Sequence, residues 1–403
     1  MNWCKEEGIF ILLSLIFLFI SCRQTEKVAG SAEIRDKSFY KTEIIEGKET
    51  TYLALDFSRL EKPAGVDEFI RVWAQPPIQQ DKTLSCWCFA TISLLESELK
   101  RLYGQEVKLS EMYVVYWEFV EKASRFVRER GHSLFAGGSE PNAVIERMRQ
   151  YGAVRATDYT GLLPGKTEHD HSQMFEEMKG YLDDCQRRNF WDEEKILAEI
   201  KKILNKHMGE PPERIVVDGR LITPREFVTH ILRIPLDDYV AVMSFKYIPF
   251  YTRGEFRVPD NWWHSQEYYN LPLDEFYQAI LTSIRKGYSL AISVDFTEPG
   301  NSGEHNVAVI PTFDIPGDYI DQESREFRLA NSSTTDDHVL HLVGYKETAK
   351  NTWFLMKDSW WTAYVGPVKG YFFHRDDYLR LKALAFLVHR EAIAPWLAKS
   401  REK

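Results

Sequence analysis

The sequence predicts an α+β fold in which two halves meet at a cleft, and three observations support it. Cys86 and Trp87 open an apolar repeat with the spacing of a helix. Far along the chain, His338 begins an apolar strand and Asp358 ends another. The 403 residues exceed the usual size of one hydrophobic core, yet no linker rich in Pro, Gly or Ser divides them. We therefore expect one half to carry the cysteine on a helix and the other to carry the histidine on a strand.

The first predicted helix starts at Cys86 and stops near Gly104, because glycine often follows a helix end. Its apolar residues recur at steps of three and four, as one buried face requires: Phe89, Ile92, Leu95, Leu99 and Leu102. A cysteine attacks as its thiolate, which a helix N-terminus and a nearby imidazolium stabilise. Cys86 is therefore the predicted nucleophile, with His338 as its base.

Two further side chains complete the predicted site. Gln80 stands six residues before Cys86, and its amide together with the Cys86 backbone N–H would hold the oxyanion of a tetrahedral intermediate. A third group should orient the histidine. Asp358 is suited to this role, since it ends an apolar strand that pairs naturally with the strand holding His338.

These residues resemble a papain-type cysteine peptidase, and specifically its bleomycin hydrolase and aminopeptidase C branch. The matching segments span residues 80 to 361 in family order: Gln80, Ser85 to Ala90, Leu109-Ser110-Glu111, Gly137-Gly138-Ser139, Asp337-His338, Gly344-Tyr345 and Lys357 to Trp360. The resemblance implies a papain-like fold of two subdomains. A helical half carries the cysteine, an antiparallel β half carries the histidine, and a mixed helix and hairpin insertion is added.

The resemblance also implies roles for individual residues. Cys86 matches the nucleophile, His338 the base and Gln80 the oxyanion-hole glutamine. Two further matches are Gly137 and Gly138, glycines whose backbone binds the extended substrate on its amino-terminal side.

Two tryptophans match supporting positions. Trp360 corresponds to the tryptophan that shields the bond between the histidine and its orienting partner from water, and Trp87 follows the nucleophile.

The chain departs from the family pattern in three respects. Asp358 stands where the family usually has asparagine, and an aspartate would hold the imidazolium more strongly. Thr83 and Leu84 occupy the positions of the Cys and Gly of the local signature, so the disulfide usually anchored there is missing. The histidine normally follows the cysteine by about 130 to 150 residues, and here the gap is larger by about 100.

An insertion over residues 155–288 accounts for the longer gap. It contains a helix that begins after Asp192 and ends at Gly209, and an Asp218-Gly219 turn between apolar runs, which predicts a hairpin. A helix over residues 273–284 and a buried strand over residues 288–295 follow. Before the insertion, a helix over residues 140–151 is expected directly after the glycine pair.

Composition restricts the possible partners. Hydrophobic residues make up 44% of the chain and aromatic residues 14%, enough for a substantial core. The net charge of -9 argues against nucleic acid as a partner, because no basic excess is present to neutralise phosphates. Peptides are the expected substrates, without a cofactor or a metal.

The N-terminus resembles an export signal. Residues 9–20 form an apolar run broken only by Ser14, too short to span a bilayer stably. The run ends at Ser21-Cys22, which resembles a bacterial lipobox in which Cys22 becomes lipidated, with an uncleaved anchor as the alternative. We expect a signal peptide over 1–22, a polar tether over 23–50, the peptidase domain over 51–395 and a charged tail over 396–403. The protein would then be anchored in the bacterial cell envelope, at the outer membrane or on the periplasmic face.

The remaining cysteines and histidines are expected to be structural. Cys88 does not share a helix face with Cys86 and is interpreted as a small buried hydrophobe, with a Cys88–Cys185 disulfide left open. A metal cluster of His338, His341 and Asp336 lacks the ligand spacing of zinc sites, so His341 is expected to face elsewhere. Five other histidines are interpreted as surface or structural residues: His132, His169, His171, His207 and His305.

The sequence thus favours a thiol-dependent peptidase, and the resemblance implies aminopeptidase trimming, with the C-terminus in the cleft and a hexameric assembly. Two alternatives stay open. Cys, His and Asp in this order also suit acyl transfer to an amine. A catalytically inactive surface lipoprotein that binds peptides or partners is the other alternative, since fold does not establish activity.

Overall fold

The computed structural model describes residues 40–45, 48–53 and 55–400, which belong to two compact units. The first unit lies within residues 1–60 and contains β1 (Tyr40–Ile45) and β2 (Lys48–Leu53), an antiparallel pair that includes the end of the predicted tether. The predicted signal peptide, Cys22 and the rest of the tether lie outside the described residues. In the part of the chain that is described, no helix is long and apolar enough to cross a membrane.

The second unit, residues 61–403, is built on one mixed sheet of eleven strands among the described residues. The order is β10-β11-β14-β13-β12-β9-β15-β6-β8-β7, with β3 paired to β12, and all pairs are antiparallel except β11 with β14 and β6 with β8. The strands are β3 (Ile70–Arg71), β6 (Tyr239–Met243), β7 (Arg253–Gly254), β8 (Tyr268–Asn270), β9 (Leu290–Val294), β10 (Asn301–Ser302), β11 (Val307–Ala308), β12 (His338–Glu347), β13 (Thr352–Lys357), β14 (Tyr371–Arg375) and β15 (Ala383–His389).

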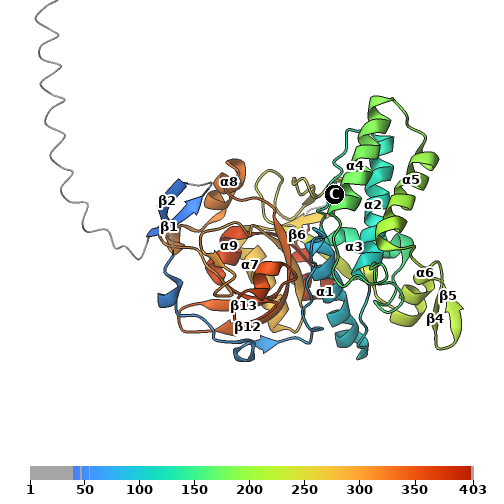
Figure 1. The fold of residues 1–403 in the computed structure, drawn as a ribbon. Helices are drawn as coiled ribbons and strands as arrows, with labels where there is room; N and C mark the ends of the chain where they lie inside the picture. The colour runs from blue at the N-terminus through green and yellow to red at the C-terminus, as the bar shows by residue number, and fades with distance from the viewer. Residues whose placement is uncertain (1–39, 46–47, 54, 401–403) are drawn as a thin grey trace, which may run out of the picture. The chain divides into compact units, whose positions relative to one another are not determined.

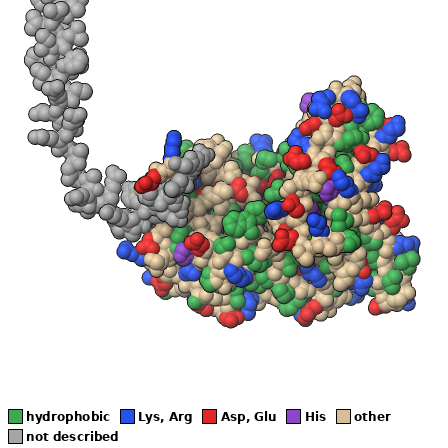
Figure 2. All heavy atoms as spheres, in the orientation of Figure 1, with side chains coloured by type: hydrophobic (Ala, Val, Ile, Leu, Met, Phe, Trp, Pro, Cys, Tyr) green, Lys and Arg blue, Asp and Glu red, His purple; other side chains and the backbone are tan. Residues whose placement is uncertain are grey.

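The helices are α1 (Cys86–Tyr103), α2 (Glu111–Arg128), α3 (Pro141–Tyr151), α4 (Ser172–Arg187), α5 (Glu193–Met208), the short α6 (Pro224–Glu226), α7 (Leu273–Arg285), α8 (Gln322–Ala330), α9 (Asp376–Lys382) and α10 (Ala394–Leu397). Helices α1 to α6 form a half beside the sheet, whereas α7, α8 and α9 lie in the half that contains the sheet (Figure 1). Helix α1 contacts β12 and β9 as well as α2 and α3, so it joins the two halves. Over α4 and α5, basic and acidic side chains are interspersed on the face that Figure 2 shows.

The two faces of the sheet bury two different cores. Because strand side chains alternate, Ala291 and Val339 belong to the core that includes α1, whereas Ile292 and Leu340 belong to the core that includes α7. The predicted papain-like α+β architecture is therefore confirmed, with a helix carrying Cys86 packed on a largely antiparallel sheet carrying His338.

Most predicted elements form for the expected local reasons. Helix α1 ends at Gly104, which adopts the left-handed conformation with φ 68°. Helix α5 is capped by Asp192, whose side chain accepts the Lys195 N–H at 3.2 Å. Asp218 and Gly219, with φ 49° and 73°, close the hairpin of β4 (Ile215–Val217) and β5 (Arg220–Ile222).

The predicted insertion, residues 155–288, is divided between the two halves. Helices α4 and α5 pack with each other, and α5 packs on α2. Strands β6 and β8, from the same region, extend the main sheet beyond β15. Part of the added chain therefore enlarges the helical half, and part enlarges the β half.

The described end of the chain is bound on the α7 side. Trp396 and Leu397 pack against the core that includes α7, the Trp396 carbonyl accepts the Tyr269 hydroxyl at 2.8 Å, and Lys399 pairs with Glu275 at 2.9 Å. Up to Ser400, these contacts are made away from the core that α1 shares.

Candidate active site

A tight loop over residues 80–85 places Cys86 at the start of α1. The Thr83 hydroxyl donates to the Gln80 carbonyl at 2.8 Å and shares a 2.5 Å hydrogen bond with the Ser85 hydroxyl. These contacts close the loop at the position where the family signature has a cysteine and this chain has Thr83. Leu84, in place of the expected glycine, has a φ of 53°, a left-handed conformation that costs an L residue about 1–2 kcal/mol.

Cys86 is the first residue of α1 and is half-buried. Ser85 precedes it, but its side chain does not cap the helix, because its hydroxyl is engaged by Thr83. The Ser85 side chain thus forms no hydrogen bond with the backbone amides of the first helical turn. These amides and the helix dipole favour negative charge at this end of the helix, where the Cys86 side chain begins.

His338 and Asp358 form a buried ion pair. The His338 Nε2–H donates to Asp358 Oδ1 at 2.7 Å, and the same oxygen accepts the Trp360 N–H at 2.8 Å. Burial lowers the pKa of His338, but the charges of Asp358 and Cys86 outweigh it and raise this pKa to about 10. His338 is therefore an imidazolium at neutral pH, set between a carboxylate and the predicted nucleophile.

Aromatic rings cover this pair. The Trp360 ring lies 6.4 Å from the His338 ring in an edge-on arrangement, and Phe296 lies 5.0 Å away on another strand end. Both contacts limit the access of water, which strengthens the interaction between the two charges. Trp360 thus lies beside the histidine that the family resemblance assigns it to shield, and its shielding role stays a prediction.

Gln80 is fixed by the residue that follows Asp358. Its backbone N–H donates to the Ser359 carbonyl at 2.9 Å, and its Oε1 accepts the Ser359 hydroxyl at 2.7 Å. Because the Gln80 Oε1 accepts this hydrogen bond, the Nε2 group is the end of the Gln80 side-chain amide that can donate to another atom. One short segment therefore positions both Asp358 and the predicted oxyanion donor.

The glycine pair lies against the nucleophile loop. A side chain at Gly137 would place its Cβ 2.9 Å from the Leu84 Cβ, and the Trp87 indole N–H donates to the Gly137 carbonyl at 3.4 Å. At Gly138 a Cβ would lie 2.0 Å from an Asp260 carboxylate oxygen. A side chain at either position would have to displace a neighbouring side chain, Leu84 at Gly137 and Asp260 at Gly138, and Gly137 lies beside the residues that flank Cys86.

Sequence reasoning missed an acidic group next to these glycines. Glu140 is fully buried beside the half-buried Asp336, with the Ser293 hydroxyl donating to Glu140 at 3.0 Å. Burial, followed by the neighbouring carboxylate, raises the pKa of Glu140 well above its usual range, and burial raises the pKa of Asp336 to about 7. Asp260, whose pKa burial also raises, adds a third carboxyl. The sequence signal was available, since Glu140 follows Gly137-Gly138-Ser139 and Asp336 lies two residues before His338.

A buried polar seam joins α1 to the sheet below the site. Lys357 donates to the Ser93 hydroxyl at 2.7 Å, and this hydroxyl shares a 2.8 Å hydrogen bond with His341 Nδ1. His341 thus faces α1 rather than His338, and Ser93 lies two turns along the helix from Cys86. Within the described ranges, no group of three or more His, Cys, Asp or Glu side chains is arranged to hold a metal ion.

All three cysteines of the second unit are free thiols. Cys88 is fully buried and donates to the Glu111 carbonyl at 3.4 Å. Burial raises the pKa of its thiol well above the usual range, so Cys88 is not an alternative nucleophile. The Cys88–Cys185 disulfide left open by the sequence is not formed.

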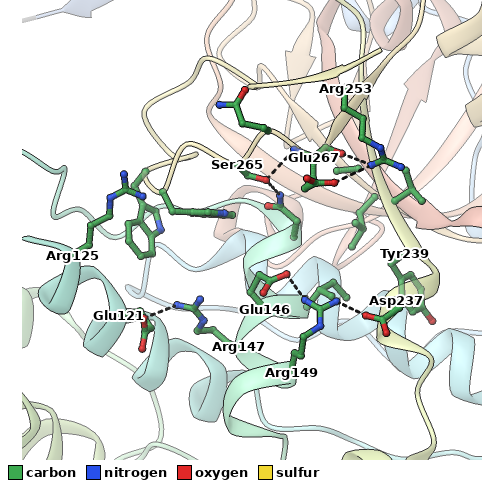
Figure 3. A pocket seen from close by; sticks show the side chains of 18 of the residues that line it. Glu121, Arg125, Glu146, Arg147, Arg149, Asp237, Tyr239, Arg253, Ser265 and Glu267 are labelled. Atoms are coloured by element: carbon green, nitrogen blue, oxygen red, sulfur yellow. Dashed lines mark hydrogen bonds and ion pairs between the residues drawn. The ribbon is translucent and has the colours of Figure 1, made fainter. Parts of the chain in front are cut away.

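A separate cavity of about 840 Å³ lies beside α3 and β6. In Figure 3 Arg147 faces Glu121, and Arg149 lies between Glu146 and Asp237. Its arginines are matched by carboxylates, and none of the predicted catalytic residues lines it. We therefore do not assign the chemistry to this cavity.

Comparison with solved structures supports the fold. The crystal structure of PepW from Lactobacillus rhamnosis HN001 aligns over 84% of this chain and 84% of that chain, with a TM-score of 0.67 and 17% identity. A structure from work on the mite allergens Blo t 1 and Der p 1 aligns over 82% of this chain and 73% of that chain, with a TM-score of 0.40 and 12% identity. No family model and no curated protein matches the sequence. The similarity to PepW shows that this chain has the papain-like fold.

Replacing Asp358 by asparagine should shift the alkaline limit of any Cys86-dependent activity to lower pH. The amide keeps an acceptor for His338 but removes the charge that raises its pKa, so the imidazolium is lost earlier as pH rises. An opposite charge at this distance is worth about 1–3 pH units. Rates measured against pH for the native protein and Asp358→Asn test this, and coincident alkaline limits would contradict it.

Replacing Asp336 by asparagine should stabilise the protein at high pH. A carboxyl whose pKa is raised binds its proton more tightly when folded, so its stabilisation is full below pH about 4 and is lost as pH rises through about 7. Asp336→Asn should therefore raise the Tm by a few degrees at pH 8 and have little effect at pH 5. The exposed Asp318→Asn is the matched control, and an equal change of Tm at both pH values would contradict a raised pKa of Asp336.

Proposed function

We propose that this protein is a thiol-dependent peptide hydrolase in which Cys86 is the nucleophile. The observation that carries the proposal is the buried His338–Asp358 pair, whose imidazolium interacts with a cysteine at the N-terminus of α1. Gln80, held by Ser359, is the matching amide donor.

The proposed reaction follows from these positions. The Cys86 sulfur bonds to the peptide carbonyl carbon, and the carbonyl electron pair moves to oxygen, where Gln80 Nε2–H and the Cys86 N–H stabilise the charge. His338 gives its proton to the leaving nitrogen, so the amine departs and a thioester remains. A water molecule then attacks the thioester while giving a proton to His338, and the Cys86 thiolate leaves with the acid product released.

Charge near the glycine pair favours substrates with a free amino terminus. The Asp260 carboxylate lies beside Gly138 and the Glu140–Asp336 pair follows, while the buried Lys122 ammonium donates to the Ala136 and Gly138 carbonyls, so three carboxyl groups and one ammonium lie near the segment assigned to the amino-terminal part of the substrate. A substrate α-ammonium would gain a charge-assisted hydrogen bond there. The described C-terminal residues bind α7 instead, so we propose that these carboxyl groups, rather than the chain end up to Ser400, favour trimming from the amino terminus.

The cellular setting is proposed from the sequence. The lipobox-like Cys22 supports a lipid-anchored protein of the bacterial cell envelope, and the resemblance to the bleomycin hydrolase branch supports a hexamer. Mass spectrometry of the N-terminal peptide and the sedimentation of the purified protein address these two points.

The activity is tested with paired peptide substrates that differ only in whether the amino terminus is free or acetylated. We expect hydrolysis that Cys86→Ala abolishes, with the free substrates cleaved about 10- to 100-fold faster, the range expected for one hydrogen bond to a charged group. Asp260→Asn should reduce this preference while leaving the acetylated rate unchanged, whereas Asp318→Asn should change neither.

Three outcomes bear on alternatives. Faster cleavage of acetylated substrates would indicate an endopeptidase. Transfer of the acyl group to an added amine, with little hydrolysis, would indicate an acyltransferase. Silence on the whole panel, without labelling of Cys86 by iodoacetamide, would exclude catalysis and leave a peptide-binding scaffold.

A further inference from the structure

Three of the histidines expected to be surface or structural residues line one cavity. His169 and His171 come from the segment that precedes α4, and His207 comes from the end of α5. The cavity measures about 380 Å³, and Lys166 and Gln173 also line it. It is open to small polar molecules and lies apart from the residues around Cys86.

His171 is a buried polar side chain facing this cavity without a partner among the described residues. Its side chain is almost entirely enclosed, with the residue 5% exposed, and neither ring nitrogen has a hydrogen bond. The His169 ring lies 6.0 Å away, and its buried Nδ1 is also without a hydrogen bond. Burial, followed by the charges of His169 and His207, lowers the pKa of His171 to about 3, so the ring is neutral and offers one donor and one acceptor.

The N-terminus of α4 faces the same space. Ser172 and Gln173, its first two residues, line the cavity, and His171 at the cap position makes no side-chain cap bond. A helix of 16 residues presents partial positive charge at this end, which favours anions. Two acids also line the cavity. Asp170 accepts the Ser172 N–H at 3.0 Å and lies 3.6 Å from the Lys82 ammonium, so its charge is partly compensated, and Glu168 is exposed to solvent.

Hydrogen bonds connect the segment that lines this cavity to the loop of residues 80–85. The His169 N–H donates to the Asp81 carboxylate at 2.9 Å, and the Lys82 N–H donates to the His169 carbonyl at 3.1 Å. The His171 N–H donates in turn to the Lys82 carbonyl at 3.1 Å. Asp81 directly follows Gln80, so a ligand held by the two histidines would contact a segment that is hydrogen-bonded to the neighbours of Gln80, the proposed oxyanion donor.

We propose that this cavity binds a small oxyanion, a carboxylate or a phosphate, between the N-terminus of α4, the imidazoles of His169 and His171, and the Lys166 ammonium. The same chemistry has two sources: the C-terminal carboxylate of a bound peptide, or a free anion that acts as an effector. Binding at this place restrains the Asp81–Lys82 segment, which adjoins Gln80, and so adds to the hold that Ser359 has on Gln80.

Binding is measured on the full chain carrying Cys86→Ala, so that the result does not depend on peptidase activity. Inorganic phosphate is titrated while the histidine ring resonances are followed by NMR. We expect saturable shifts of the His169 and His171 rings and none of the exposed His132 ring. Lys166→Ala and His171→Ala should each weaken binding by about tenfold or more, as loss of a charge-assisted contact predicts, whereas His132→Ala should not.

A second titration distinguishes the source of the anion. Peptides with a free C-terminal carboxylate are compared with the same peptides as C-terminal amides. Tighter, Lys166-dependent binding of the free acids supports the proposal with a peptide terminus as ligand, and equal binding of both with saturable phosphate binding supports a free effector. Absence of saturable phosphate shifts together with equal binding of acids and amides would overturn the proposal. Lys166 is exposed, so its variant remains informative even if His171→Ala does not fold.

Discussion

The packing of α1 on β12 is the constraint on which the rest of the site depends. Cys86 belongs to the helix and His338 to the strand, so their separation is set by how the two halves of the fold meet. The seam of Ser93, His341 and Lys357 fixes that junction with hydrogen bonds of 2.7 and 2.8 Å between buried groups. Such contacts have directional requirements that apolar packing lacks, so they specify one position of the helix against the sheet.

Charged side chains of α1 and its neighbours are also buried beside this seam. Glu96 of α1 is fully buried, accepts the Leu109 N–H at 2.8 Å and pairs with Lys108 at 3.0 Å. Burial lowers the pKa of Lys357 to about 8, while the charge of Glu96 counteracts this effect. Removing one member would leave a partner buried without compensation, which is costly, so the charges of the seam act as a unit. The nucleophile thus stands at the end of a helix that is held in register by an electrostatic network rather than by a disulfide.

Sequence reasoning predicted many secondary-structure elements correctly because their signals are local. The helix at Cys86, the Gly104 stop, the Asp192 cap and the Asp218-Gly219 turn each depend on a few neighbouring residues, and each forms as expected. The match of Trp360 and Gln80 to positions beside Asp358 came from the family resemblance. The order of the residues along the chain therefore sufficed for the fold class, whereas the roles assigned to the site residues stay predictions.

The features that were missed depend on contacts between distant segments. Strands β6 and β8 join the sheet through pairs with β15 and with each other, which no local pattern reveals. Glu140, just before α3, and Asp336, just before β12, interact although they are far apart in the sequence, and the His171 ring is buried without a hydrogen bond among the described residues because its segment folds beside α5. The Thr83 hydroxyl replaces a covalent link by hydrogen bonds, an outcome that depends on the conformation of the loop.

The central claim is that His338 is an imidazolium held by Asp358 and Cys86, and the most direct measurement is the NMR titration of the His338 ring in the native protein and in Cys86→Ala. The account predicts that the ring remains protonated through neutral pH and titrates near pH 10 in the native protein, with a lower midpoint in Cys86→Ala, because the sulfur charge is one of the two that raise this pKa. A midpoint close to the ordinary value of about 6.5 in both proteins would contradict the account.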